Sequence, residues 1–135
     1  GDAFGLVYPA LQHAGRFAIA STSPIDFDPA QARASLDRIL ALEARHVCLT
    51  HFDAIEDPTE VAAQVRQWID RAEGWLEECL ASEAPVDEQV NRVTRQIRAV
   101  LANLPFGPAD YELLATDIDL NAQGVVVASE RRKKK

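Results

Sequence analysis

The sequence predicts an α/β fold, in which a strand–helix–strand unit precedes a mostly helical C-terminal region. Short apolar runs of strand-forming residues occupy the first fifty positions, with one helical pattern between them. From residue 57 onward, apolar residues recur at three- and four-residue steps, as they do on the buried face of a helix. We therefore expect two domains, with the strands in residues 1–56 and helices packed on them in residues 57–135.

The predicted strands are residues 3–8, 17–20 and 46–50. The last of them, HVCLT, is apolar between polar neighbours, which is typical of a strand buried in a covered sheet. A helix over about residues 29–43 joins the second strand to the third, with Asp28 as its N-cap. This βαβ unit is expected to cross over with the right hand.

The helical region begins at Asp57, where an Asp-Pro helix start recurs. Trp68 and Trp75 lie seven residues apart in its first stripe and indicate a core face rather than a cofactor site. The breakers SEAP and PFGP separate the segments that follow. The last segment, DIDLNAQGVVVASERR at 117–132, is ambiguous, because LNAQ favours a helix whereas GVVVA favours a strand.

The charge distribution argues against a nucleic-acid partner. The formal net charge is −7, and five of the 14 basic residues form the tail RRKKK at 131–135. Residues 1–130 therefore carry 9 arginines against 21 acidic residues, a balance that repels a phosphate backbone. We expect the tail to be a solvated end. No run of about 18 apolar residues is present, which argues against a membrane partner as well.

The two cysteines, Cys48 and Cys79, lie in apolar stretches and lack metal-type spacing. We expect them to be small core residues in a reducing, cytoplasmic compartment, with a disulfide between them as the alternative. The chain contains no methionine, and we expect it to be the C-terminal portion of a longer protein.

Asp2 and His51 are the candidate functional residues. His51 follows a predicted strand, and ligands gather outside the carboxyl ends of strands in open α/β sheets. Taken singly, a histidine after a strand more often bonds a backbone carbonyl or water than a metal. His46, which opens the same strand, is expected to contact solvent.

Taken together, the motifs resemble the metallo-β-lactamase superfamily. They are GDAFG, a loop with a TSP element, an amphipathic helix, and an apolar strand that ends in LTHF. Their order and spacing agree with that family over about residues 1–55. The resemblance implies the second half of an αββα sandwich, followed by a helical C-terminal extension, and it implies a metal-dependent hydrolase.

In that family the aspartate of the GD motif bridges two metal ions, usually zinc, and a later histidine binds one of them. The resemblance implies that Asp2 is the bridging ligand and His51 the terminal ligand, of zinc or another divalent metal. Thr50 or a backbone group would orient the imidazole. The metal pair would activate a water for attack on a small-molecule substrate. Tyr8 and His13 are candidates for lining the substrate pocket, with packing and solvent contact as their alternatives.

The chain departs from the family pattern in two respects. The HxHxDH metal motif and the histidine expected before GD are absent, and two ligands cannot hold two metal ions, so the isolated chain should be inactive. The partner that completes the site would be the missing N-terminal half or a second copy. Asp53 takes the place of the glycine in THFG, and we interpret it as a tolerated substitution at a turn with positive φ rather than as a ligand.

The alternative function is a non-catalytic, helical protein-interaction module. Residues 57–132 supply enough amphipathic helix to form a small bundle or to pack on a partner. This function would not depend on Asp2 or His51.

Overall fold

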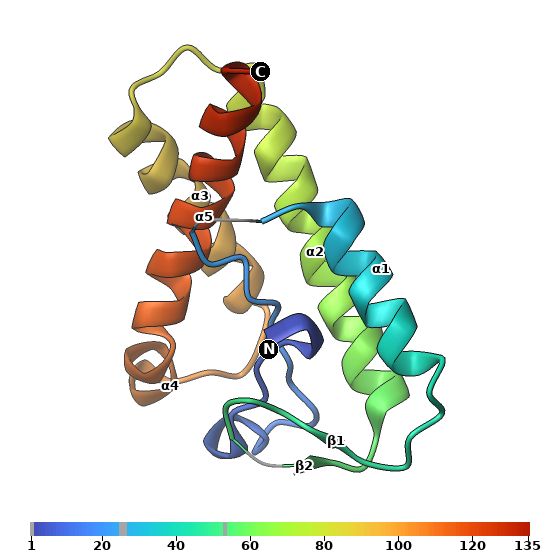
Figure 1. Ribbon diagram of the computed structural model, residues 1–135. Coiled ribbons are helices and arrows are strands. Elements are labelled where there is room, and N and C mark those ends of the chain that lie inside the picture. The colour runs from blue at the N-terminus through green and yellow to red at the C-terminus, as the bar shows by residue number, and fades with distance from the viewer. Residues whose placement is uncertain (1, 25–26, 53) are drawn as a thin grey trace. The chain divides into compact units, whose positions relative to one another are not determined.

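The computed structural model describes residues 2–24, 27–52 and 54–135, and it is mostly helical. Helices make up 65% of the chain, and the one sheet among the described residues has two strands (Figure 1). The predicted α/β fold, the second half of an αββα sandwich, is therefore wrong.

The elements follow one another in the order η1, η2, α1, β1, β2, α2, α3, α4, α5. Their bounds are Asp2–Phe4 (η1), Pro9–Leu11 (η2), Pro29–Leu40 (α1), Val47–Cys48 (β1), Ala54–Ile55 (β2), Pro58–Leu80 (α2), Val86–Leu101 (α3), Pro108–Leu113 (α4) and Ala115–Lys133 (α5). The two strands pair antiparallel, with Val47 opposite Ile55 and Cys48 opposite Ala54. This hairpin contains no crossover, so the predicted βαβ unit is absent from the described residues.

The first two predicted strands are buried chain that forms no sheet. Residues 3–8 and 17–20 meet only at an antiparallel bridge, where Leu6 N donates to Ile19 O at 2.8 Å and Ile19 N to Leu6 O at 3.1 Å. Residues 4–7 of the first run and all of the second run are buried, whereas Ala3 is exposed. Their apolar composition predicts burial correctly, but a short apolar run does not distinguish a strand from irregular buried chain.

The third predicted strand, HVCLT, is reduced to β1, and most of its side chains are exposed. Cys48 is exposed, so its assignment to the core is wrong, whereas Cys79 is fully buried as predicted. Both cysteines are free, which excludes the disulfide alternative in this structure. With only β2 beside it, β1 lacks the covered sheet that would bury such a run.

The helix predictions are largely confirmed. Asp28 caps α1, with its Oδ1 accepting from Gln31 N at 3.0 Å, and α1 ends at Leu40 rather than at residue 43. Glu43 has a positive φ of 49°, a conformation in which the helix cannot continue. The ambiguous segment 117–132 lies entirely within α5.

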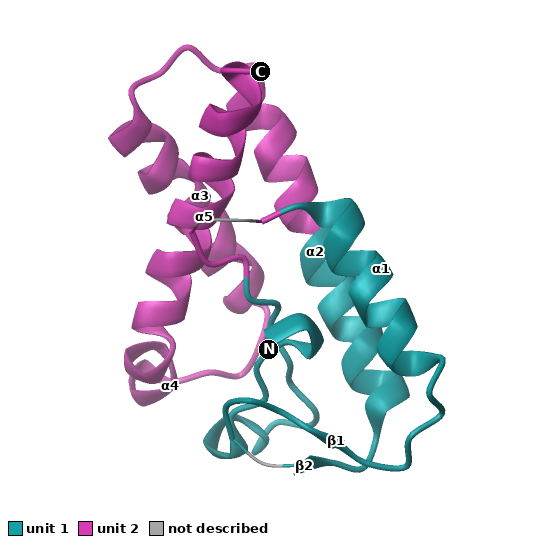
Figure 2. Cartoon of the chain, viewed as in Figure 1, with its two compact units in different colours: residues 1–21, 28–70 teal, residues 22–27, 71–135 magenta. Residues whose placement is uncertain are grey.

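The chain divides into two compact units (Figure 2). Unit 1 consists of residues 1–21 and 28–70, and unit 2 of residues 22–27 and 71–135. The predicted boundary between residues 56 and 57 coincides with the start of α2, whereas the units divide inside that helix. Trp68 is buried in unit 1 and Trp75 in unit 2, which confirms both as core residues.

Two glutamines hold the first loop of unit 1 in place. Gln12 Nε2 donates to Tyr8 O and to Phe17 O, each at 2.9 Å, while its Oε1 accepts from Phe17 N at 3.0 Å. Gln64 of α2 binds the same loop from the other side, donating to Arg16 O and accepting from Ala18 N, both at 2.8 Å. Residues 8–18 are therefore fixed by hydrogen bonds without a sheet.

In unit 2 the segment that contains Thr22 lies against α5. Thr22 N donates to Asn121 Oδ1 at 2.8 Å, and Thr22 Oγ1 donates to Asn121 O at 3.0 Å. Gly124 permits this approach, because a Cβ at that position would overlap the Thr22 carbonyl oxygen.

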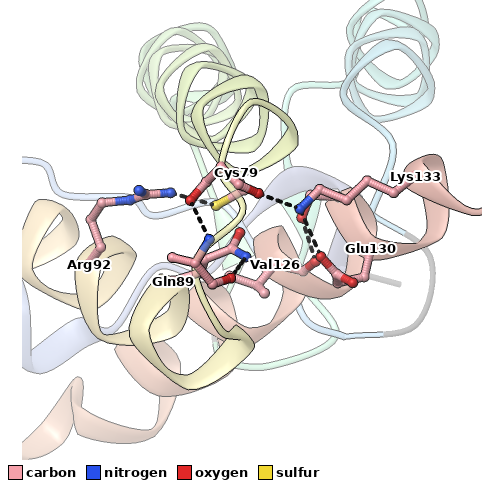
Figure 3. A network of polar contacts seen from close by, with 9 residues as sticks. Cys79, Gln89, Arg92, Val126, Glu130 and Lys133 are labelled. Carbon is pink, nitrogen blue, oxygen red and sulfur yellow. Dashed lines mark hydrogen bonds and ion pairs between the residues drawn. The ribbon is translucent and has the colours of Figure 1, made fainter.

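A polar network ties the ends of α2, α3 and α5 together within unit 2 (Figure 3). Lys133 Nζ donates to Ser82 O at 2.9 Å and pairs with Glu130 Oε1 at 3.0 Å. Arg92 Nη2 lies 3.6 Å from Cys79 Sγ, and Gln89 Nε2 donates to Ala84 O at 2.6 Å. The first three residues of the predicted tail belong to α5, and all five are exposed, in agreement with the predicted solvated end. Among the described helices, none is long and apolar enough to cross a membrane.

Candidate functional site

The structure brings Asp2 and His51 together, although they are 49 positions apart in the chain. His51 Nε2 lies 3.5 Å from Asp2 Oδ1. Both residues belong to unit 1. They come from η1 and from the loop that joins β1 to β2, and neither element is a strand of a larger sheet.

Local contacts position each of the two side chains. Asp2 begins η1, whose turn is closed by Gly5 N donating to Asp2 O at 2.9 Å; η1 contains the buried Phe4 and contacts α1. His51 precedes Phe52, whose ring centroid lies 4.2 Å from that of Tyr8. Phe52 has a φ of 72°, which is uncommon for a bulky residue and turns the loop sharply after His51.

The Asp2–His51 pair is accessible to further groups. The side chain of His51 is 58% exposed and that of Asp2 38% exposed. An ion pair with this exposure contributes about 0–1 kcal/mol to stability, so the fold does not depend on it.

The separation of the two atoms agrees with the separation of ligands on one zinc ion. Two ligand atoms about 2.1 Å from a tetrahedral zinc are about 3.4 Å from each other. The same separation of 3.5 Å also occurs in the surface ion pair of Arg132 Nη1 and Glu77 Oε1. The donor set, an imidazole and a carboxylate, is one that zinc accepts. Among the described residues, no group of three or more histidine, cysteine, aspartate and glutamate side chains is placed to hold a metal ion. The described part of the chain therefore contains a histidine–carboxylate pair at Asp2 and His51 but no larger cluster of metal-binding side chains around it.

Unit 1 contains a second histidine–carboxylate pair that serves as a comparison. His46 Nε2 lies 3.8 Å from Glu56 Oε1, with side chains 56% and 83% exposed. The predicted solvent exposure of His46 is confirmed. This pair matches the residue types of the Asp2–His51 pair but is more widely spaced and more open.

The other predicted site residues fall in different places. Tyr8 packs on Phe52 and so lies beside the loop of His51. His13 is exposed in the turn after η2, beside Gly15. Thr50 is exposed, and Asp53 lies outside the described residues.

Sequence reasoning missed a pocket in unit 1. Its cavity volume is about 220 Å³, and its lining residues are Val7, Pro9, Gln12, Arg16, Ala54 and Ile55. They come from the loop that contains η2 and from β2, two segments about forty positions apart. No local pattern predicts this pairing; the signal that the sequence does contain is an arginine next to the buried run FAIA.

Near this pocket, the start of α2 contains an acidic pair. A side-chain hydrogen bond that the protonated Glu60 carboxyl donates to Asp57 raises the pKa of Glu60 above its ordinary value of 4.5, and desolvation and the charge of Asp57 raise it further. The charge of Arg16 acts in the opposite direction and lowers the pKa of Glu60. The charge of Arg16 therefore affects the electrostatic potential at the start of α2.

Unit 2 contains a larger and more apolar groove between α3 and α5. Its cavity volume is about 380 Å³, and its lining residues are Val86, Asp87, Val90, Asn91, Gln123, Val126 and Val127. Val86 is 50% exposed at its edge.

Comparison with known proteins finds no family model, no curated protein and no solved structure that matches this chain. The resemblance to metallo-β-lactamases thus rests on the motifs of the sequence.

Proposed function

We propose that this chain supplies Asp2 and His51 as ligands to the metal centre of a metal-dependent hydrolase, with zinc as the metal. The observation that carries the proposal is the 3.5 Å separation of His51 Nε2 and Asp2 Oδ1. Two residues far apart in sequence are close together with their metal-binding atoms adjacent and accessible. The ion pair between the two side chains contributes only about 0–1 kcal/mol to the stability of unit 1.

In the complete centre, metal ions would supply a water of lowered pKa as the nucleophile. The Asp2 carboxylate has two oxygens, so it can contact two cations at once, as the bridging role requires. His51 would bind through Nε2, the ring nitrogen that faces Asp2. Phe52 and Tyr8 hold the loop of His51 in place, so the imidazole needs little rearrangement to bind.

The proposal requires further ligands from another polypeptide segment or from a second copy of the chain, since the described residues offer two. The substrate is a small molecule and the compartment is the cytoplasm. The chain on its own should bind zinc weakly and should not hydrolyse a substrate.

Zinc binding by the purified chain tests the proposal, measured by competition with a chromogenic chelator. We expect Asp2→Asn and His51→Ala each to lower the affinity for zinc at least about tenfold, which is about 1.4 kcal/mol. His46→Ala and Glu56→Gln are matched controls, because they alter the other histidine–carboxylate pair of unit 1, and they should leave the affinity unchanged.

Equal effects of the two pairs of variants would show that zinc binds exposed histidines without preference, and the proposal would be abandoned. The alternative function, a protein-interaction module, would then become the better one. It is favoured by the apolar groove between α3 and α5, with a second copy of this chain as the partner. The acidic first turn of α3 and the basic last turn of α5 are complementary in charge between copies.

A further inference from the structure

The pocket of unit 1 combines an apolar lining with one arginine. Val7, Pro9, Ala54 and Ile55 supply the apolar part. Gln12 also lines the pocket, but both of its amide atoms are used within the loop, as donor to Tyr8 O and Phe17 O and as acceptor from Phe17 N. Arg16 is thus the side chain of the lining with hydrogen-bonding capacity to spare.

The backbone of Arg16 is fixed by hydrogen bonds, whereas its guanidinium makes few of them. Arg16 O accepts a hydrogen bond from Gln64 Nε2. The backbone N–H groups of the next two residues, Phe17 and Ala18, donate to Gln12 and Gln64 respectively. The side chain of Arg16 makes one long hydrogen bond, from Nη1 to Gln12 Oε1 at 3.4 Å. Within residues 2–24, 27–52 and 54–135, no carboxylate forms an ion pair with it. Arginine has five N–H donors in a planar fork, so most of its donors remain available.

We propose that this pocket binds the carboxylate of a small organic acid, with Arg16 pairing with the carboxylate and the apolar residues contacting the hydrocarbon part. A guanidinium fork matches a carboxylate with two parallel hydrogen bonds. The volume of about 220 Å³ is below the roughly 300–1,000 Å³ of pockets for drug-sized ligands, so the ligand is small.

The surrounding charges select a carboxylate over a phosphate. Glu60 feels the charge of Arg16, and Asp57 lies within hydrogen-bonding distance of Glu60. The negative charge of Glu60 and its neighbour Asp57 reduces the positive potential that Arg16 produces. A singly charged carboxylate suits such a site better than a phosphate with a charge of about −1.5 to −2 at neutral pH.

The pocket also adjoins the candidate metal ligands along the chain. Tyr8 lies between two lining residues and packs on Phe52, which follows His51, and Ala54 is three positions beyond His51. The proposal that the pocket binds a carboxylate depends only on the pocket and not on the metal site. The pocket's role as the specificity pocket of a hydrolase rests on the proposed function.

The test is a two-dimensional amide NMR titration of the ¹⁵N-labelled chain with benzoate, with benzamide as an uncharged molecule of the same shape. We expect benzoate to shift the signals of residues 7–17 and 54–55 saturably, and benzamide to bind at least about tenfold more weakly. Arg16→Gln should weaken benzoate binding to the level of benzamide, and Arg16→Lys should restore part of it. Arg45→Gln, which alters an exposed arginine outside the pocket, is the control.

Several outcomes would overturn the proposal. Equal binding of benzoate and benzamide would leave an apolar pocket without carboxylate recognition, and this comparison needs no variant. Inorganic phosphate binding more tightly than benzoate would contradict the choice of a carboxylate. Unchanged benzoate affinity in Arg16→Gln would show that Arg16 does not bind the carboxylate. The proposed metal site is tested separately, because His51→Ala should leave benzoate binding intact and Arg16→Gln should leave zinc affinity intact.

Discussion

At the scale of single residues, two glycines of similar sequence context have opposite roles. Gly124 and Gly74 both lie inside helices. A Cβ at Gly124 would overlap the carbonyl oxygen of Thr22, whereas a Cβ at Gly74 would meet no atom within 4 Å. The sequence shows two helical glycines, and only the contact with Thr22 distinguishes them.

We therefore predict opposite effects of Gly124→Ala and Gly74→Ala on the free energy of unfolding. Gly124→Ala should destabilise by about 1–3 kcal/mol or more, because the Thr22 segment must move off α5 and lose its bonds to Asn121. Gly74→Ala should stabilise by up to about 1 kcal/mol, because alanine is the better helix former. Urea unfolding followed by circular dichroism measures both. A Gly124→Ala chain as stable as the original would contradict the close contact.

Single residues also show the limits of sequence reasoning about the site. The resemblance to metallo-β-lactamases selects Asp2 and His51, and the structure places their side chains together. Phe52 was missed, because a positive φ at a phenylalanine has no sequence signal. The pocket that Arg16 lines was missed, because it depends on β2, which lies about forty positions further along the chain.

At the scale of elements, the Asp-Pro starts illustrate what local chemistry predicts well. Both occur where helices begin, at α1 and α2. At α1 the aspartate side chain accepts the hydrogen bond of a cap. At α2 the aspartate instead interacts with Glu60 in the first turn, and this raises the pKa of Glu60. The same Asp-Pro motif therefore provides a helix cap at α1 and a pair of interacting carboxyl groups at α2.

The start of α2 gives a prediction about pH. Since the pKa of Glu60 is raised, the folded chain binds this proton more tightly than the unfolded chain. The interaction therefore stabilises the fold below about pH 4.5, and this stabilisation is lost as the pH rises through the raised pKa. Asp57→Asn should lower the pKa of Glu60, measured by ¹³C NMR titration of its carboxyl group.

Arg16→Gln is the complementary variant for this titration. Its effect should have the opposite sign, because the positive charge of Arg16 lowers the pKa of Glu60 and its removal raises it. A Glu60 titration that is the same in the original chain and in Asp57→Asn would rule out the interaction between the two carboxyl groups.

At the scale of the whole molecule, α2 is the element that belongs to both compact units. Residues 58–70 of this helix lie in unit 1 and residues 71–80 in unit 2. Each part contributes one buried tryptophan, Trp68 and Trp75 respectively. A continuous helix is a cooperative structure, so unfolding of one part removes hydrogen bonds from the other.

We predict that the two units unfold together. The Trp68→Phe variant keeps Trp75, whose fluorescence reports on unit 2 alone. The Trp75→Phe variant keeps Trp68, which reports on unit 1 alone. The fluorescence transitions of the two variants in urea should coincide with the loss of helical circular dichroism in each, as two-state unfolding requires. Separate fluorescence and circular dichroism transitions within one variant would show that α2 does not couple the units.

The sequence by itself determined where α1 and α2 start, that Trp68 and Trp75 belong to a buried helical face, and which two residues are candidate metal ligands. These properties depend on neighbours within a few positions, or on motifs that local residues carry. The tertiary structure alone decided that the apolar runs 3–8 and 17–20 form no sheet, and that 117–132 is helical. It also decided that Arg16 meets β2 in a pocket. These outcomes depend on which distant segments supply the partners for backbone hydrogen bonds and apolar surface, and one-dimensional periodicity does not contain that information.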